Sequence, residues 1–252
     1  MDNVLEDIKR IEFDKIDYHK SSIDYFEVVE GNIPILISAP HGARHLRPKI
    51  EKGKRTGAWK EEDEYTAAIA IKLGELTGAH IIYVKNKTIE DSNNEEVTEY
   101  KMAVKNIIEK HGIKFLVDIH GAGEDNEFDV AIGIIDKKNM EKCSCPERKS
   151  VIEECFKDLK GAVFNPPKFS AASSGTMTSF ARKVCKIEAA QFEINTKYRV
   201  VERKPDSSKA VQNIDANFKA DEKDVLGMVK RLEKMVNRIA EDIEGKGGKK
   251  HG

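Results

Sequence analysis

Short apolar runs of strand length alternate along this chain with longer stretches in which apolar residues recur at helical spacing. The first kind predicts strands and the second predicts helices. The expected strands span residues 25–30, 33–39, 80–84, 114–119, 128–135 and 187–194. The expected helices span residues 61–76, 95–110, 147–160 and 221–243, with a short helix at most at 179–184. This alternation predicts an α/β fold: three αβα layers with a mixed, mainly parallel central sheet covered by helices on both faces.

Three connecting or terminal segments carry their own signals. Gly31-Asn32 lies between the first two strands and predicts a hairpin turn that joins them. Residues 41–60 are polar and basic, and we expect a long loop there, of the kind that is often functional. The helix at 221–243 is strongly amphipathic, so we expect it to pack on the domain, with a dimer interface as the alternative.

Three of the expected strands end close to a side chain that can do chemistry. His41 follows the strand at 33–39, His120 follows the strand at 114–119, and Glu193 lies near the end of the strand at 187–194. Ligands of open α/β sheets bind outside the carboxyl ends of the strands, so these three side chains are expected to meet there. Asp118 points to the same face of its strand as His120 and is a candidate to orient that imidazole. The alternative for each histidine is a loop or surface residue without a role.

An acidic cluster, Glu61-Glu62-Asp63-Glu64, comes directly after the His41 segment. Acidic residues are favoured in the first turn of a helix, which is a sufficient structural explanation for the cluster. A carboxylate with two histidines is also a recurrent catalytic zinc set that leaves the fourth position for water. The spacing by itself does not choose among the four acids.

Glu193 belongs to a strand whose one face is entirely polar near its end, through Gln191, Glu193 and Asn195. A carboxylate in that position can take a proton from a zinc-activated water. The alternative is a strand with one solvated face. Arg44 and Arg47, which follow His41, and Arg199, which follows Glu193, are candidates to bind an anionic substrate, because a guanidinium recognises carboxylates bidentately. The alternative for each is ordinary surface charge.

Composition and charge narrow the class of protein. The chain has 252 residues, of which 39% are hydrophobic and 35% charged, so it can bury one substantial core. We expect a single domain at residues 1–244 and a disordered, glycine- and lysine-rich tail at 245–252. The formal net charge of −1 argues against a nucleic-acid or anionic-membrane partner. No apolar run approaches the roughly 20 residues that span a bilayer, and no signal peptide is evident, so a cytoplasmic location is expected.

Four short motifs together resemble the N-formylglutamate amidohydrolase family, which is related to the zinc carboxypeptidases and has a phosphorylase/hydrolase-like α/β fold. The motifs are Pro40-His41-Gly42, Asp63-Glu64-Tyr65-Thr66, Asp118-Ile119-His120 and Gln191-Phe192-Glu193-Ile194-Asn195. The resemblance spans roughly residues 33–200. It implies Zn²⁺ bound by His41, Asp63 and His120, and Glu193 as the general base. Asp63 is preferred because it aligns with the family acid three residues before the threonine.

The resemblance also bears on the substrate. Family members often carry an Asp-x-Asn-Arg segment between the two histidines, whereas this chain has Asp91-Ser92-Asn93-Asn94 and lacks the arginine. Arg199 falls where the family has a carboxylate-binding site. We therefore expect Asn93, Arg44 and Arg199 to contact the substrate, and the acyl amino acid to differ from that of the family.

The function expected from the sequence is zinc-dependent hydrolysis of the amide bond of a small N-acylated amino acid, with N-formylglutamate as the type substrate. A carboxypeptidase-like metallopeptidase is the alternative within the same class. A catalytically degenerate binding protein that keeps the fold is the alternative outside it.

Overall fold

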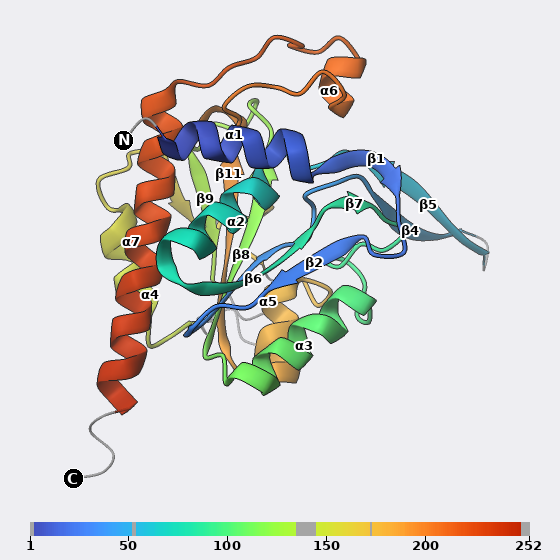
Figure 1. The fold of residues 1–252 in the computed structure, drawn as a ribbon. Helices are drawn as coiled ribbons and strands as arrows, with labels where there is room; N and C mark the ends of the chain where they lie inside the picture. Colours follow the sequence, from blue (N-terminus) through green and yellow to red (C-terminus); the bar gives the residue numbers. More distant parts are fainter. Residues whose placement is uncertain (1–2, 52–53, 135–144, 172, 248–252) are drawn as a thin grey trace.

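The computed structural model describes residues 3–51, 54–134, 145–171 and 173–247 (Figure 1). Its centre is a seven-stranded mixed sheet. In spatial order the strands are β10 (Ala162–Phe164), β9 (Val130–Gly133), β11 (Glu188–Asn195), β8 (Phe115–Ala122), β3 (Ile33–Ala39), β6 (Ala79–Val84) and β2 (Phe26–Val29). The four strands β11, β8, β3 and β6 run parallel, and antiparallel pairing enters only toward the edges, between β9 and β11 and between β2 and β6.

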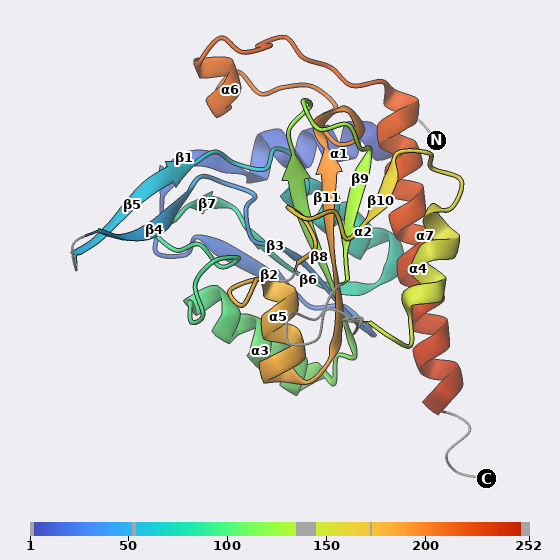
Figure 2. The ribbon, with the colours of Figure 1, turned by 180° about the vertical axis from the view of Figure 1, so that it is seen from behind.

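Helices cover both faces of this sheet (Figure 2). One layer is formed by α1 (Asn3–Lys15), α2 (Thr66–Thr77), α4 (Lys149–Phe156) and α7 (Glu222–Gly247), which contact one another, with α2 and α7 also touching β3. The other layer is formed by α3 (Glu99–His111), α5 (Met177–Phe180) and the π-helix η1 (Ala181–Cys185), with α5 on β8 and β11. The predicted fold class, three αβα layers around a mainly parallel sheet, is confirmed.

The register of the central strands decides where side chains meet. Glu193 of β11 lies opposite His120 of β8, and Asp118 of β8 lies opposite Ser38 of β3. Parallel pairing brings the carboxyl ends of all three strands to one edge of the sheet, where ligands of open α/β sheets bind. The middle of β3 is fully buried at Ile35, a consequence of being covered on both faces.

The predicted hairpin between the first two strands of the sheet is wrong. β2 pairs with β6, and β6 lies between β2 and β3, so Gly31-Asn32 connects strands that are not neighbours. Burial explains the difference, because Val28 and Val29 of β2 are 38% and 40% exposed, as befits an edge strand. The uniformly apolar β3 needs neighbours on both sides, and a two-residue turn signal does not reveal which strands supply them.

The basic segment at residues 41–60 is not a structureless loop. It folds into an antiparallel ribbon of β4 (His45–Glu51) and β5 (Lys54–Lys60), in register from His45 opposite Lys60 to Glu51 opposite Lys54. The ribbon projects from the body of the molecule beside β1 (Asp17–Ser21) and β7 (Asn86–Lys87) (Figure 1). Polar and apolar residues do alternate along His45-Leu46-Arg47-Pro48-Lys49-Ile50, but the many Lys and Arg residues obscured this strand signal.

Helix α2 begins at Thr66, five residues later than predicted, and it has no acidic residue in its first turn. The acidic cluster therefore precedes the helix instead of stabilising its dipole. Glu12 of α1, a helix that the sequence analysis missed, lies at this end of α2, where its Oε1 accepts a hydrogen bond from the Tyr65 amide at 2.9 Å. The delayed start leaves Asp63 free to point away from the helix.

The C-terminal helix extends beyond the boundary predicted between the domain and its tail. The long C-terminal helix α7 buries its apolar side chains against α2, α4 and β3, as expected for packing on the domain. It continues to Gly247, three residues into the segment predicted to be a tail, and residues 248–252 lie outside the described part of the chain. Across the described residues, no helix combines the length and apolarity that a bilayer crossing requires.

Glu12 gives a prediction about stability. It is fully buried, and burial raises the pKa of its carboxyl from 4.5 to about 7. The folded state then holds this proton while the unfolded chain has lost it, so this group makes stability fall as pH rises between those two values. Glu12→Gln, which cannot ionise, is expected to remove that loss, worth about 3 kcal/mol by pH 8. Urea unfolding at pH 5 and pH 8 measures it. Glu6→Gln on the exposed side of α1 is the control, and an unchanged pH slope in Glu12→Gln would contradict the prediction.

Candidate metal centre

A cavity of about 550 Å³ opens where the carboxyl ends of β3, β8 and β11 meet. Its floor contains all four side chains predicted to carry the chemistry, namely His41, Asp63, His120 and Glu193. Its walls are formed by loop residues at Asn93 and Asn94, by the loop from Pro167 to Ala171, and by Ser173 and Thr176. The structure therefore brings together residues that are up to 152 positions apart in the sequence, from 41 to 193.

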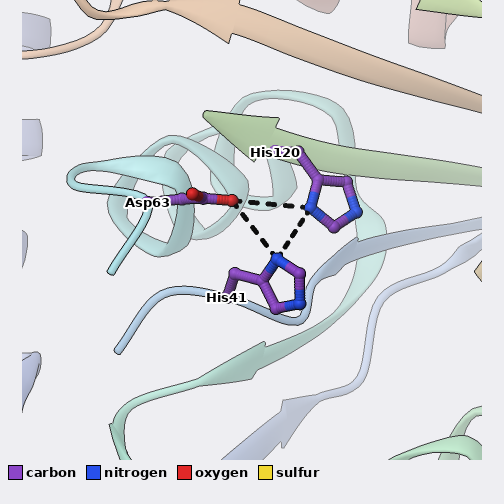
Figure 3. A group of neighbouring side chains, drawn as sticks. All are labelled: His41, Asp63 and His120. Atoms are coloured by element: carbon purple, nitrogen blue, oxygen red, sulfur yellow. Dashed lines mark hydrogen bonds and ion pairs between the residues drawn. The ribbon is translucent and has the colours of Figure 1, made fainter. Parts of the chain in front are cut away.

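His41, Asp63 and His120 present three donor atoms to one point (Figure 3). The Nδ1 atoms of the two histidines are 3.2 Å apart, and Asp63 Oδ2 lies 3.4 Å from His41 Nδ1 and 3.5 Å from His120 Nδ1. Donors about 2.0–2.1 Å from a tetrahedral zinc ion would stand about 3.3 Å from one another. The three side chains thus fit one face of a tetrahedral coordination shell.

The backbone around Pro40-His41-Gly42 holds His41 in place. β3 ends at Ala39, immediately before this turn, and the Asp63 amide donates a hydrogen bond to the His41 carbonyl at 2.8 Å. Gly42 packs so closely on the carbonyl oxygen of Val84 that a side chain at position 42 would collide with backbone. The same contacts therefore fix the direction of His41 and the distance of Asp63 from it.

Each histidine is oriented by a buried carboxylate on its far side. His120 Nε2 lies 2.9 Å from Asp118 Oδ2, and His41 Nε2 lies 3.0 Å from Asp91 Oδ1, with both acids fully buried. An imidazole that donates its Nε2 proton to a carboxylate keeps its Nδ1 lone pair for a metal, and metal-bound histidines are commonly held in this way. The contact of Asp118 with His120 was expected from their shared strand face, whereas the contact of Asp91 with His41 was not.

Hydrogen bonds set the charge of the third donor. Burial opposes ionisation of Asp63, but the hydrogen bonds from His120 and His41 outweigh it and hold the pKa of this carboxyl well below its usual range. The carboxylate is therefore ionised and available as a ligand. Burial also opposes a charge on His120, yet the adjacent Asp118 raises the pKa of that imidazole. A metal ion at this point would take the place of protons, so its binding would release them.

Of the four acids that sequence spacing left open, Asp63 is the one that faces the histidines. Glu61 accepts a hydrogen bond from Gln212 at 2.8 Å. Glu62 accepts hydrogen bonds from the amide and hydroxyl of Ser208 at 2.6 and 2.7 Å, and Glu64 is ion-paired with Arg203 at 3.1 Å. These contacts tie residues 203–212, which include α6 (Ser208–Val211), to the loop that carries Asp63.

Asp118 gives a prediction about metal affinity. Asp118→Asn keeps the shape of the side chain but removes the charge that orients His120 and favours its role as a ligand. We expect zinc affinity to fall about 10- to 100-fold, the usual cost of losing an outer-sphere partner. Competition with a chromophoric chelator measures the affinity, and Asp14→Asn at the exposed end of α1 is the matched control. Equal affinities for the variant and the control would show that Asp118 has no such role.

Glu193 faces the same cavity from β11. Gln191 Nε2 donates a hydrogen bond to Glu193 Oε1 at 2.7 Å, which fixes the carboxyl relative to the strand. Burial raises the pKa of Glu193 to about 7, although the neighbouring His120 opposes the rise. A carboxyl group with such a pKa can both accept and return a proton near neutral pH.

Solved structures share this arrangement of strands and helices. The chain matches the crystal structure of N-formylglutamate amidohydrolase from Ralstonia eutropha JMP134 with a TM-score of 0.56 and 12% identity, over 89% of this chain and 100% of that one. It shares the fold of an N-formylglutamate amidohydrolase. A gene product of Agrobacterium tumefaciens matches with a TM-score of 0.55 and 11% identity, over 90% of this chain and 100% of that one. No protein-family model matches the sequence, and no curated protein matches it. At these identities the likeness establishes the fold, as the four sequence motifs implied.

The arginine missing from the Asp-x-Asn-Arg pattern has a counterpart elsewhere in the chain. Arg47 reaches the cavity from β4, and its Nε donates a hydrogen bond to Asp91 Oδ2 at 2.6 Å. Its side chain remains 40% exposed. Asn93 also lines the cavity, as expected for a substrate contact, but its Oδ1 accepts a hydrogen bond from the Met177 amide at 2.8 Å.

The other two candidate arginines, Arg199 and Arg44, do not line the cavity. The Arg199 guanidinium donates hydrogen bonds to the main-chain carbonyls of Glu64, Ile194 and Ala122, and it is absent from the cavity lining. A Cβ atom on Gly121 would lie 2.7 Å from it, so the guanidinium packs directly against Gly121. Arg44 is half-buried and also does not line the cavity. The placement of both side chains argues against direct contact with substrate, and of the three candidate arginines Arg47 is the one that lines the cavity.

His45 is a buried neighbour of the site that the sequence analysis missed. Its ring stacks on that of His41 with centroids 3.9 Å apart and planes 5° from parallel. Burial lowers the pKa of His45 to about 3, so the ring is neutral. His41, His45 and Asp91 also lie close enough to hold a metal ion. That group, however, would need His41 Nε2, which is already hydrogen-bonded to Asp91, so the Asp63 side is the better site.

Proposed function

We propose that this protein is a zinc-dependent hydrolase that cleaves the amide bond of a small N-acylated amino acid. One observation carries the proposal: His41, Asp63 and His120 present three donors with the spacing of a tetrahedral zinc shell, and the cavity beside them is open to substrate. The donor set of two nitrogens and one oxygen leaves a fourth position for water.

The residues around the three donors supply the acid–base chemistry. Zinc held by His41, Asp63 and His120 would lower the pKa of a water molecule and polarise the scissile carbonyl. Glu193 would accept the proton of the attacking water and return it to the nitrogen of the leaving amine. Gln191 would keep the Glu193 carboxyl turned toward the cavity through its 2.7 Å hydrogen bond.

Arg47 is the cation that we assign to the carboxylate of the substrate. Its Nε is engaged by Asp91, and its half-exposed side chain lines the cavity. Lys168, in the loop that begins at Pro167, also lines the cavity and adds a second positive charge. An acyl amino acid carries a carboxylate close to its amide, so it can reach Arg47 while the amide faces the donors. The fold shared with N-formylglutamate amidohydrolase makes N-formylglutamate the first substrate to test.

A substrate panel on zinc-loaded protein tests the proposal. N-formylglutamate, N-acetylglutamate and N-formylglutamine would be compared with a blocked dipeptide that carries a free carboxyl terminus, by following release of the free amine. Turnover of the acyl amino acids in preference to the dipeptide supports the proposal. Preference for the dipeptide would indicate the carboxypeptidase-like alternative. Tight binding of acyl amino acids without turnover would indicate a binding protein of the same fold.

A further inference from the structure

A second, smaller cavity of about 330 Å³ lies in the groove between α3 and the α5–η1 segment. These elements lie side by side in both views of the molecule (Figures 1 and 2). The side chains that define the groove are Val97, Lys101, Met102, Phe180, Lys183 and Val184. Ser174 also lines it, whereas Ser173 and Thr176 of the same loop line the 550 Å³ cavity at the candidate metal centre. The two cavities thus lie on opposite sides of one loop.

The rim of this groove is unusually apolar for a surface. Val97 is 74% exposed, Met102 is 46% exposed and Val184 is 50% exposed, and the buried Phe180 also lines the groove. Single exposed apolar residues are ordinary, but several that surround one cavity mark a place where an apolar group is bound.

The base of the groove is cationic. Lys101 is only 1% exposed, and burial lowers its pKa to about 8. Its ammonium donates hydrogen bonds to the main-chain carbonyls of Glu95 and, at 2.7 Å, Gly175. Both acceptors are neutral, and within the described part of the chain Lys101 takes part in no ion pair. An ammonium has three protons to donate, so a third is left for another acceptor.

The remaining charges at the groove favour an anion. Lys105 and Lys183 flank the opening, against one acidic residue, Glu96. Lys105 is 3.7 Å from Glu109, at the upper limit of an ion pair, and its side chain is 36% exposed. The carboxylates of Asp118, Asp91, Glu96 and Glu95 favour the charged form of Lys101 from a distance, but none forms an ion pair with it in the described part of the chain. An anion that reaches Lys101 would therefore give this buried ammonium a charged acceptor in direct contact.

We propose that this groove binds a small organic monoanion with an apolar body, its charged group on Lys101 and its hydrocarbon part against Phe180, Val184 and Met102. The volume lies at the lower end of the range for small-molecule sites, about 300–1,000 Å³. A cavity of this volume is too small to accommodate a helix or a protruding part of a second copy of the chain. The combination of an apolar rim and one buried cation matches an amphipathic carboxylate.

Octanoate is the probe, and calorimetric titration of the full chain is the measurement. We expect saturable one-to-one binding of octanoate and no comparable binding of octanol, which has the same chain length without the charge. Val184→Asp places a like charge at the rim and is expected to weaken binding by about tenfold or more. Val211→Asp, at a valine of α6 that is 68% exposed, is the control and is expected to bind octanoate as the unchanged chain does.

Three outcomes would overturn the proposal: no saturable binding of octanoate, equal binding of octanol, or equal weakening by both substitutions. Val184 is half exposed, so its substitution avoids the loss of folding that replacement of the buried Lys101 could cause. Binding is measured without any substrate, and the result is therefore independent of hydrolytic activity at the metal centre.

Discussion

Replacing His120 by alanine is expected to abolish both zinc binding and amide hydrolysis. The substitution removes one of three donors that stand 3.2–3.5 Å apart, and it leaves the fully buried Asp118 without its 2.9 Å partner. Two donors, His41 and Asp63, would remain. We expect zinc affinity to fall further than the roughly 10- to 100-fold that loss of an outer-sphere partner costs. Hydrolysis should fall with it, because the activated water depends on the ion.

Metal analysis and kinetics on the same preparations check this result. Protein purified without chelators would be assayed for zinc stoichiometry and for amine release, with His111→Ala as the control. His111 lies at the end of α3 and has no contact with the metal centre. Stoichiometric zinc together with undiminished activity in His120→Ala would contradict the proposed function.

Replacing Glu193 by glutamine is expected to slow catalysis while zinc binding is retained. Glu193 lines the cavity but is not one of the three donors, and glutamine has nearly the same shape. Loss of general acid–base catalysis typically costs about 10²- to 10⁴-fold in rate. We expect a loss of that size in kcat, with an unchanged zinc content.

The pH dependence of the reaction adds a second readout for Glu193. Burial raises the pKa of this carboxyl to about 7, and a general base must be unprotonated to accept a proton. Activity should therefore fall as pH drops through that value, or through a somewhat lower one, since a bound cation opposes the effect of burial. Glu193→Gln should lose this acidic limb.

The exposed Glu127 provides the matched control for this substitution. Glu127→Gln is expected to keep both the rate and the pH profile of the unchanged chain. If Glu193→Gln lost zinc as readily as His120→Ala, Glu193 would be a ligand instead of a base. Full activity of Glu193→Gln would remove it from the mechanism altogether.

Much of the central fold could be predicted because its elements carry strong local signals. β3, β8 and β11 are apolar runs of strand length, and α7 shows apolar residues at helical spacing over its whole buried face. The errors occur where a non-local contact decides. β2 pairs with β6 and not with β3, the next strand along the chain. This choice depends on which strand has an unpaired edge in the assembled sheet.

In the candidate site too, local sequence signals identified some residues and non-local contacts decided others. The sequence motifs pointed to His41, His120 and Glu193 from their positions at strand ends, and the family resemblance selected Asp63. Hydrogen bonds in the folded chain give an independent reason for that selection, since Glu62 and Glu64 are held by Ser208 and Arg203.

The substrate side of the site could not be predicted in the same way. Arg199 follows Glu193 closely in the sequence, yet the turn after β11 directs its guanidinium onto main-chain carbonyls. Arg47 reaches the cavity because it belongs to the ribbon of β4 and β5 instead of a loop. The partnership of Asp91 with both Arg47 and His41 joins segments 44 and 50 residues apart, and no spacing rule anticipates it.

The sequence by itself determined the fold class, the strands that carry the chemistry and the residue types at their ends, because burial and backbone geometry impose local periodicities. The tertiary structure decided the strand order, the acid that faces the histidines, the carboxylates that orient them and the arginine that lines the cavity. Those choices depend on distances between segments remote in sequence, and such distances exist only once the sheet has assembled and its side chains compete for the same partners.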